Sequence, residues 1–131
     1  MKRVTGLGGI FFKADDLEKI RDWYKKHLGF QIEDWGGSYF KWKELDKPDA
    51  KVPAGTVWSP FKSDTDYFTP SQKPFMFNYR VENLTELLKV LKEEGVTVMD
   101  KVEELPYGKF GWIMDPEGNK IELWEPKDEG F

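Results

Sequence analysis

The chain has 131 residues, a length typical of one domain, and its net charge of −4 argues against a nucleic-acid partner. It contains no cysteine, so disulfide bonds, thiolate-ligated metals and cysteine nucleophiles are excluded. Aromatic residues make up 16% of the sequence and include six Trp. Rings in such number serve as core filler, pocket lining or interface anchors.

The first part of the chain predicts one β-α-β-β-β module. Residues 4–14 alternate loosely and are expected to form a strand. Asp15 and Glu18 have the spacing of a capping box at a helix start, and Gly29 is expected to end that helix. Apolar residues recur between them at helical spacing: Leu17, Ile20, Tyr24 and Leu28. The remaining strands are predicted at 30–35, 38–45 and 55–61, with a polar loop at 46–53.

The second part repeats this order after an aperiodic connector at about 62–73. A strand is expected at 75–81, and Asn83 is the expected N-cap of a helix that ends near Gly95. The helical stripe consists of Leu84, Leu87, Leu88 and Leu91. A strand at 96–102 and a hairpin around the turn Asp115-Pro116-Glu117-Gly118-Asn119 complete the module. Two similar halves in this order indicate an internal duplication.

Alternation along the strands assigns their residues to two faces of the sheet. One face is expected to pack against the helices: Ile10, Phe12, Phe77, Tyr79, Val81, Ile113, Ile121 and Leu123. The opposite face is mostly aromatic and contains one acid: Gly9, Phe11, Met76, Asn78, Phe110, Trp112, Glu122 and Trp124. An exposed flat sheet does not normally carry so many rings. We therefore expect a curved sheet whose inner face forms a cleft around Glu122.

The segments at 16–30 and 115–123 resemble the vicinal oxygen chelate superfamily, the glyoxalase / bleomycin-resistance / extradiol-dioxygenase group. The resemblance covers roughly residues 4–126. It implies a single α+β domain over residues 1–131, in which module one (about 4–61), the connector and module two (about 74–126) form a curved, mixed, eight-stranded sheet around a cleft. The helices would lie on the outer face. A second subunit often borders the cleft, so a homodimer is expected.

The resemblance also implies where a metal would be held. Enzymes of this family bind a divalent metal through His, Gln or Glu on the first and last strands of each module. The corresponding positions here are Gly9, Trp58, Met76 and Glu122, and only Glu122 is a ligand of that kind. Glycine has no side chain, and a Met thioether suits Cu(I) better than Mg, Mn, Fe or Zn. We therefore expect neither a metal nor another cofactor, and we expect the single His27 at the surface near the helix end.

Three hypotheses for function follow. The first is a protein that binds a small aromatic or apolar molecule in the cleft, through Phe11, Trp58, Met76, Asn78, Phe110, Trp112, Glu122 and Trp124. The second is a metal-dependent lyase, isomerase or dioxygenase, in which Glu122 is the best catalytic candidate and the missing ligands come from a partner chain. The third is a dimeric interaction module with the aromatic residues buried between two chains. Residues 62–73 are either a lid or a plain linker.

The expected location is the cytoplasm. The first residues lack the apolar run of a signal peptide, and no stretch approaches the length of a transmembrane helix. The absence of cysteine fits a reducing compartment. We expect no membrane and no nucleic acid as a partner.

Overall fold

The computed structural model describes residues 2–42 and 54–127, so the predicted loop at 46–53 and the end of the strand at 38–45 lie outside it. The described chain forms seven strands and two helices: β1 (Val4–Ala14), α1 (Leu17–Leu28), β2 (Ser38–Lys41), β3 (Gly55–Lys62), β4 (Phe75–Val81), α2 (Leu84–Glu93), β5 (Thr97–Leu105), β6 (Gly108–Met114) and β7 (Lys120–Pro126). Neither α1 nor α2 is long and apolar enough to cross a membrane.

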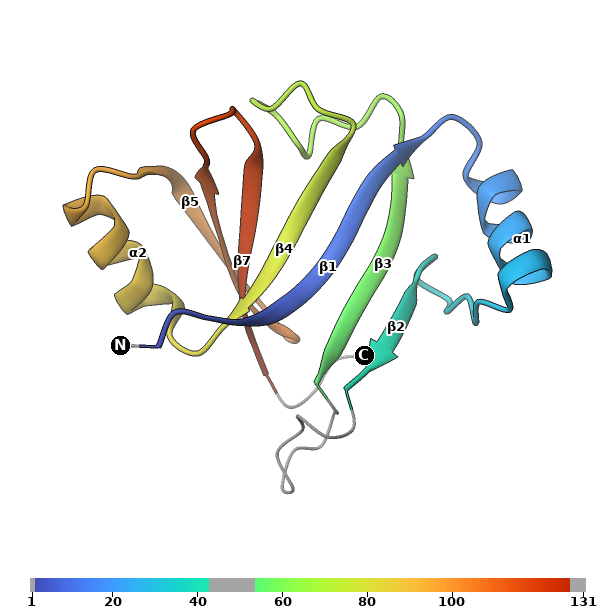
Figure 1. Cartoon of the computed structure of the whole chain (residues 1–131), viewed down its shortest axis with the longest axis horizontal. Coiled ribbons are helices and arrows are strands. Elements are labelled where there is room, and N and C mark those ends of the chain that lie inside the picture. Colours follow the sequence, from blue (N-terminus) through green and yellow to red (C-terminus); the bar gives the residue numbers. More distant parts are fainter. Residues whose placement is uncertain (1, 43–53, 128–131) are drawn as a thin grey trace.

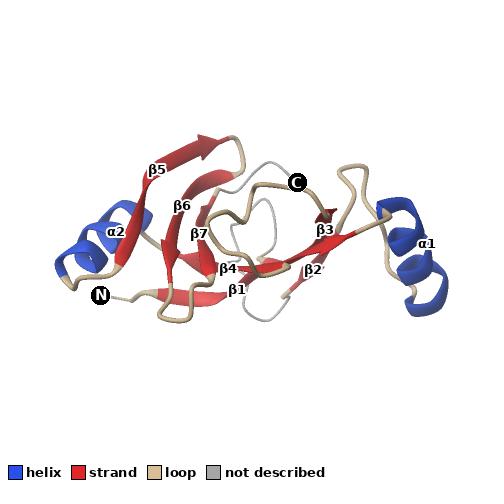
Figure 2. Cartoon of the chain, turned by 90° about the horizontal axis from the view of Figure 1, so that it is seen from above, coloured by secondary structure: helices blue, strands red, loops and turns tan. Residues whose placement is uncertain are grey.

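All seven strands belong to one mixed sheet in the order β2-β3-β1-β4-β7-β6-β5. The two modules join at its centre, where β1 pairs antiparallel with β4. Inside each module the first strand pairs in parallel with the last, β1 with β3 and β4 with β7. Figure 2 shows β5, β6 and β7 curling up from β1 and β4, so the sheet is concave on one side. The predicted α+β fold of two repeated modules around a curved sheet is confirmed.

The predicted strand at 30–35 is wrong. This segment is a loop whose backbone bonds are local, because Glu33 N donates to Gly37 O (2.8 Å) and Gly36 N donates to Glu33 O (2.9 Å). Gly36 adopts a positive φ of 97°, which folds the segment back on itself. The described sheet therefore has seven strands where eight were expected. The loop brings Trp35 to the edge of the concave face.

The start of α1 differs by one residue from the prediction. Asp16 is the N-cap, and its carboxylate accepts a hydrogen bond from Lys19 N at 3.0 Å. The capping box expected between Asp15 and Glu18 is therefore wrong, because two adjacent aspartates offered alternative caps and the second has the extended backbone of an N-cap. Gly29 ends the helix at a φ of 69°, as predicted.

Helix α2 covers the outer face of the second module. Asn83 caps it as predicted, by accepting a hydrogen bond from Glu86 N at 3.1 Å. Its leucines form a buried cluster with two residues of the sheet: Leu84, Leu87, Leu88, Val81 and Leu123. The helix approaches β6 closely at Gly111, where an added Cβ would lie 2.9 Å from Leu88 Cδ1. The predicted helix-facing side is thus confirmed for this half of the sheet.

Neither helix covers the outer face of the sheet between them, and no other described segment does so. Figure 1 shows α1 and α2 at opposite ends of the sheet, with β1 and β4 between them. Helix α1 has no fully buried residue and packs mainly beside β3. Ile10 and Phe77 were expected to face a helix, but they remain 38% and 39% exposed. The prediction gave these two residues the correct face, but neither helix reaches them.

The hairpin of β6 and β7 forms around the predicted turn. The carboxylate of Asp115 accepts hydrogen bonds from Glu117 N and Asn119 N, both at 2.9 Å. Gly118 supplies the positive φ, at 79°. The hairpin fixes the register of β7, which carries Glu122 on the face opposite α2.

Candidate functional site

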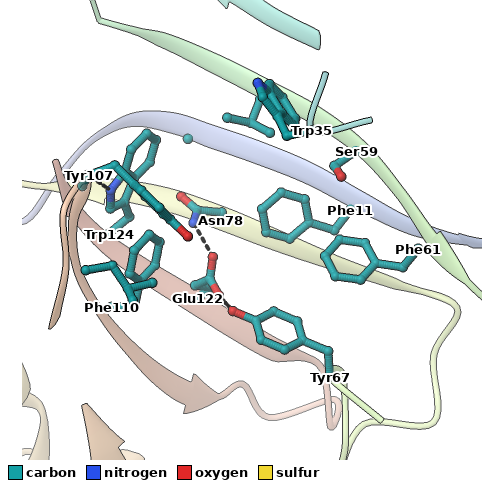
Figure 3. A pocket seen from close by; sticks show the side chains of 13 residues that line it. Phe11, Trp35, Ser59, Phe61, Tyr67, Asn78, Tyr107, Phe110, Glu122 and Trp124 are labelled. Carbon is teal, nitrogen blue, oxygen red and sulfur yellow. Dashed lines mark hydrogen bonds between the residues drawn. The ribbon is translucent and has the colours of Figure 1, made fainter. Parts of the chain in front are cut away.

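The concave face of the sheet holds a cavity of about 300 Å³. Aromatic rings form most of its wall: Phe11, Trp35, Phe61, Tyr67, Tyr107, Phe110 and Trp124. Asn78 and Glu122 lie between these rings at the floor, as Figure 3 shows. An apolar cavity with a few convergent polar groups is the usual form of a small-molecule site.

The sheet register brings the polar floor together. Gly9 of β1 lies opposite Asn78 of β4, and Asn78 lies opposite Glu122 of β7. On the other side of β7, Trp112 of β6 also lies opposite Glu122. Residues paired across neighbouring strands share a face, so the side chains of Asn78, Glu122 and Trp112 form one row across the concave side.

Glu122 is buried, with 2% of its surface exposed, and three side chains donate hydrogen bonds to it. Its Oε1 accepts from Asn78 Nδ2 at 2.6 Å. Its Oε2 accepts from Trp112 Nε1 at 2.9 Å and from the Tyr67 hydroxyl. Burial raises the pKa of Glu122, and the three hydrogen bonds oppose that rise. Because every neighbour donates, the arrangement matches an ionised carboxylate, which can only accept.

Tyr67 anchors the connector (residues 62–73) to Glu122 through its hydroxyl group. Burial and the nearby Glu122 charge raise the pKa of Tyr67, so its hydroxyl stays protonated and remains a donor. Its carbonyl oxygen accepts a hydrogen bond from Lys120 Nζ at 2.6 Å. The next residue, Phe68, is completely buried in the cluster under the cleft. The connector is therefore packed against the site and is not a plain linker.

Lys120 places a positive charge beside the floor. Its ammonium lies 5.3 Å from the ring centroid of Tyr67 and 5.5 Å from that of Trp112. Burial lowers the pKa of Lys120, while the Glu122 carboxylate acts in the opposite direction. A second cavity of about 260 Å³ begins here, on the far side of Tyr67 and Trp112.

Asn78 has one polar atom without a partner. The side chain is 1% exposed, and its Oδ1 finds no hydrogen-bond donor in the described part of the chain. The backbone of Gly8 lies directly beside this oxygen, and a Cβ at Gly8 would overlap with it. Both residues line the cavity. The oxygen thus occupies space that exists only because position 8 has no side chain.

Most of the predicted cleft residues lie around the cavity: Phe11, Asn78, Phe110, Glu122 and Trp124. Met76 and Trp112 lie on the same face but do not line this cavity. Met76 is completely buried in the cluster beneath it, and Trp112 borders the second cavity.

The placement of Trp58 in the cleft is wrong. Its ring packs on the outer face against Tyr24 and Phe30, with centroids 4.7 Å and 4.9 Å apart. Its neighbours in β3, Val57 and Ser59, line the cavity instead. Successive side chains of a strand point to opposite faces. The predicted register of β3 was off by one residue, so Trp58 was assigned to the concave face when it lies on the outer face.

Four aromatic residues of the site were missed by sequence reasoning: Trp35, Phe61, Tyr67 and Tyr107. Phe61 follows the alternation of Val57 and Ser59, so a correct register for β3 would have found it. Tyr67 and Phe68 are adjacent rings in an otherwise polar segment, a pattern that indicates an anchored loop. Tyr107 lies between β5 and β6, and its carbonyl oxygen accepts from Trp124 Nε1 at 3.0 Å.

The residues present do not fit a catalytic divalent metal. Across residues 2–42 and 54–127, no three side chains of His, Cys, Asp or Glu gather at one place. The oxygens of Glu122 face N–H and O–H donors, and the corresponding position on β1 is Gly9. The one histidine, His27, is exposed on α1 and contacts the ring of Trp23 at 5.1 Å, which confirms its predicted surface position.

Solved structures with a similar fold include several enzymes. A methylmalonyl-CoA epimerase variant from Streptomyces coelicolor has a TM-score of 0.65 at 13% identity, covering 94% of this chain and 98% of that one. Methylmalonyl-CoA epimerase from Mycobacterium tuberculosis has a TM-score of 0.58 at 22% identity, covering 94% and 89%. The 2,3-dioxygenase LapB from Pseudomonas sp. KL28 has a TM-score of 0.58 at 20% identity, covering 97% of this chain and 42% of that one. Likeness at these identities shows the fold alone.

A comparison with curated protein sequences finds no match. The family model that matches is described as the Glyoxalase/Bleomycin resistance protein/Dioxygenase superfamily, and it covers residues 6–123. That match spans both modules, the connector and Glu122, and it agrees with the order of the strands. The chain belongs to the glyoxalase / bleomycin resistance protein / dioxygenase superfamily.

Proposed function

We propose that the protein binds a small, flat aromatic or apolar molecule in the concave cleft, without covalent chemistry. The observation that carries this proposal is the cavity of about 300 Å³, whose wall is formed mainly by rings. Pockets that hold small ligands range from about 300 to 1,000 Å³. The cavity is at the lower end, which favours a ligand of one or two fused rings.

The aromatic wall favours flat ligands because rings stack and bury apolar area together. Phe110 and Trp124 already stack on each other, with centroids 5.9 Å apart and planes inclined by 6°. Both rings also line the cavity, so a ring of the ligand can pack against them there. The interaction-module hypothesis, in which these rings are buried between two chains, predicts instead that no cavity remains in the assembled oligomer.

The polar floor gives the ligand an orientation. Glu122 and Asn78 are buried and held by each other, so their positions are fixed before a ligand arrives. Such preorganisation reduces the entropy lost on binding. The superfamily uses one fold for epimerases and dioxygenases, so membership alone selects no substrate. The homodimer expected from the resemblance is part of this proposal, and sedimentation velocity tests it.

A thermal-shift screen of one-ring and two-ring aromatic compounds tests the proposal. A ligand at about one hundred times its Kd should stabilise the protein by about 2.7 kcal/mol. Phe110→Leu removes one ring from the cavity wall and should reduce the shift. Trp23→Leu is the matched control, because it removes an exposed ring from α1 and should leave the shift unchanged. If no aromatic compound raises the melting temperature, the proposed function is wrong.

A further inference from the structure

The cleft contains a hydrogen-bond acceptor that the protein itself does not use. Asn78 Oδ1 is buried, its side chain lines the cavity, and it has no donor within residues 2–42 and 54–127. Buried side-chain acceptors without a partner are uncommon in folded proteins. The oxygen lies in the cavity wall between Asn78 and Gly8, which both line the cavity, so a small displacement of this wall opens it to a donor on a ligand.

Glu122 determines which end of the Asn78 amide is free. The carboxylate only accepts, so the NH₂ group of Asn78 must face it, and the Nδ2 to Oε1 distance is 2.6 Å. The carbonyl oxygen therefore points the other way, toward Gly8, and Figure 3 shows the bond between Asn78 and Glu122. The orientation of the amide thus follows from the charge of its neighbour.

The surrounding charges select among possible donors. The guanidinium of Arg80 lies over the Trp124 ring at 4.9 Å, and the ammonium of Lys120 lies over Tyr67 and Trp112. Two cations therefore already lie against aromatic rings of the site, and Lys120 also acts electrostatically on Glu122. A third positive charge would be repelled by both, so a neutral donor fits better. A flat ligand can carry a neutral donor as a ring N–H, an amine or a hydroxyl, and of these the ring N–H of an indole-type heterocycle donates without accepting.

We propose that the cleft selects a flat nitrogen heterocycle whose ring N–H donates to Asn78 Oδ1. Glu122 acts as a positioning residue that keeps this oxygen directed at the ligand. This inference rests on the proposed function, because it assumes that an aromatic ligand occupies the cavity. It adds the chemical group that the ligand must carry.

Indole, benzofuran and indene test the inference, because their rings have nearly the same shape and differ in one group: N–H, oxygen or CH₂. Each is titrated into ¹⁵N-labelled protein, and the tryptophan Nε1–H signals report its Kd. Indole should bind about tenfold more tightly than the other two, since it alone satisfies the buried acceptor. Benzofuran should bind no better than indene, because its ring oxygen faces the oxygen of Asn78.

Glu122→Gln should remove or reverse this preference. The carbonyl of the introduced glutamine is needed by Tyr67 and Trp112, so its NH₂ group must face Asn78. The Asn78 amide then turns, so that its oxygen accepts from this new NH₂ group and its own NH₂ group faces the cavity. Benzofuran should now bind at least as tightly as indole. Tyr79→Phe alters the same strand on its opposite face and should keep the wild-type preference.

The outcomes separate the two proposals. Equal Kd values for the three compounds on the unaltered protein would overturn the N–H inference and leave aromatic binding intact. Failure of all three to bind would overturn the proposed function and the inference with it. An unchanged preference for indole in a folded Glu122→Gln variant would show that Asn78 is not oriented by Glu122, and would also overturn the inference. If that variant does not fold, the comparison on the unaltered protein still decides.

Discussion

Replacing Tyr67 with Phe tests whether the connector is fastened to the cleft floor through Glu122. The substitution removes one hydroxyl and keeps the ring, which stacks on Phe61 with centroids 5.5 Å apart. The hydrogen bond from Lys120 is also kept, because it goes to the carbonyl oxygen of residue 67. The measured change therefore reports the single O–H bond to Glu122.

The magnitude follows from the charge of the acceptor. A hydrogen bond to an ionised group contributes about 1.5–3 kcal/mol, against about 0.5–1.5 kcal/mol for a neutral pair. With Glu122 ionised, Tyr67→Phe should lower the free energy of unfolding by about 1.5–3 kcal/mol. Once Glu122 takes up a proton, the loss should fall to about 1 kcal/mol, because the bond then joins two neutral groups.

Urea denaturation followed by tryptophan fluorescence measures both values, in a pH series that starts at about pH 8 and descends until Glu122 takes up its proton. Tyr79→Phe is the matched control, because it removes a hydroxyl from the outer face of β4 and should change stability by less than about 0.5 kcal/mol. The reasoning is refuted if Tyr67→Phe is no less stable than this control at the higher pH. It is also refuted if the loss does not become smaller as Glu122 takes up its proton along the pH series.

Four further predictions concern Glu122, two glycines of the sheet and the metal content of the protein. Burial raises the folded-state pKa of Glu122 above its unfolded value. The wild type should therefore gain stability as pH falls from the folded pKa toward the unfolded value of about 4.3. Urea denaturation over a pH series should show that Glu122→Gln lacks this gain. Gly8→Ala should displace Asn78 Oδ1, lower stability by about 1–3 kcal/mol and weaken indole binding in the NMR titration. Gly111→Ala should lower the free energy of unfolding by about 1–3 kcal/mol, because the added methyl overpacks against Leu88. Indole binding should stay unchanged, since Gly111 lies under α2 on the outer face. A loss of binding would contradict the separation of the outer face from the concave face. Elemental analysis of protein purified without chelator should find less than about a tenth of a metal ion per chain, whereas about one per chain, lost in Glu122→Ala, would favour the metal-dependent hypothesis.

The sequence predicted those parts of the site whose alternation is continuous. Asn78 and Glu122 stand in uninterrupted strands, so a period of two assigned each to the correct face. Trp58 was placed on the wrong face because its strand follows the predicted polar loop at 46–53, and nothing local in the sequence fixes the register after such a break. The choice between Asp15 and Asp16 as helix cap depends on the backbone angles at the end of β1, which the sequence does not specify.

The adjacent rings of Tyr67 and Phe68 indicate an anchored loop, but no local pattern shows which residue Tyr67 contacts. It comes from the aperiodic connector, and its contact with Glu122 joins residues 55 positions apart in the chain. The unpartnered oxygen of Asn78 was equally hidden, because it depends on the register between β1 and β4 and on the missing side chain of Gly8. Such contacts are properties of the assembled sheet and are absent from any single segment.

The assembly of the cavity from three segments has a thermodynamic consequence. Phe11 and Phe61 come from the first module, Tyr67 from the connector, and Glu122 from the second module. A ligand that touches all three binds only when the halves are joined along β1 and β4, so ligand binding and the association of the halves must strengthen each other by the same factor. A chain divided within the connector would then behave as a ligand-dependent pair of fragments, and the aromatic ligand would act as the molecule that brings them together.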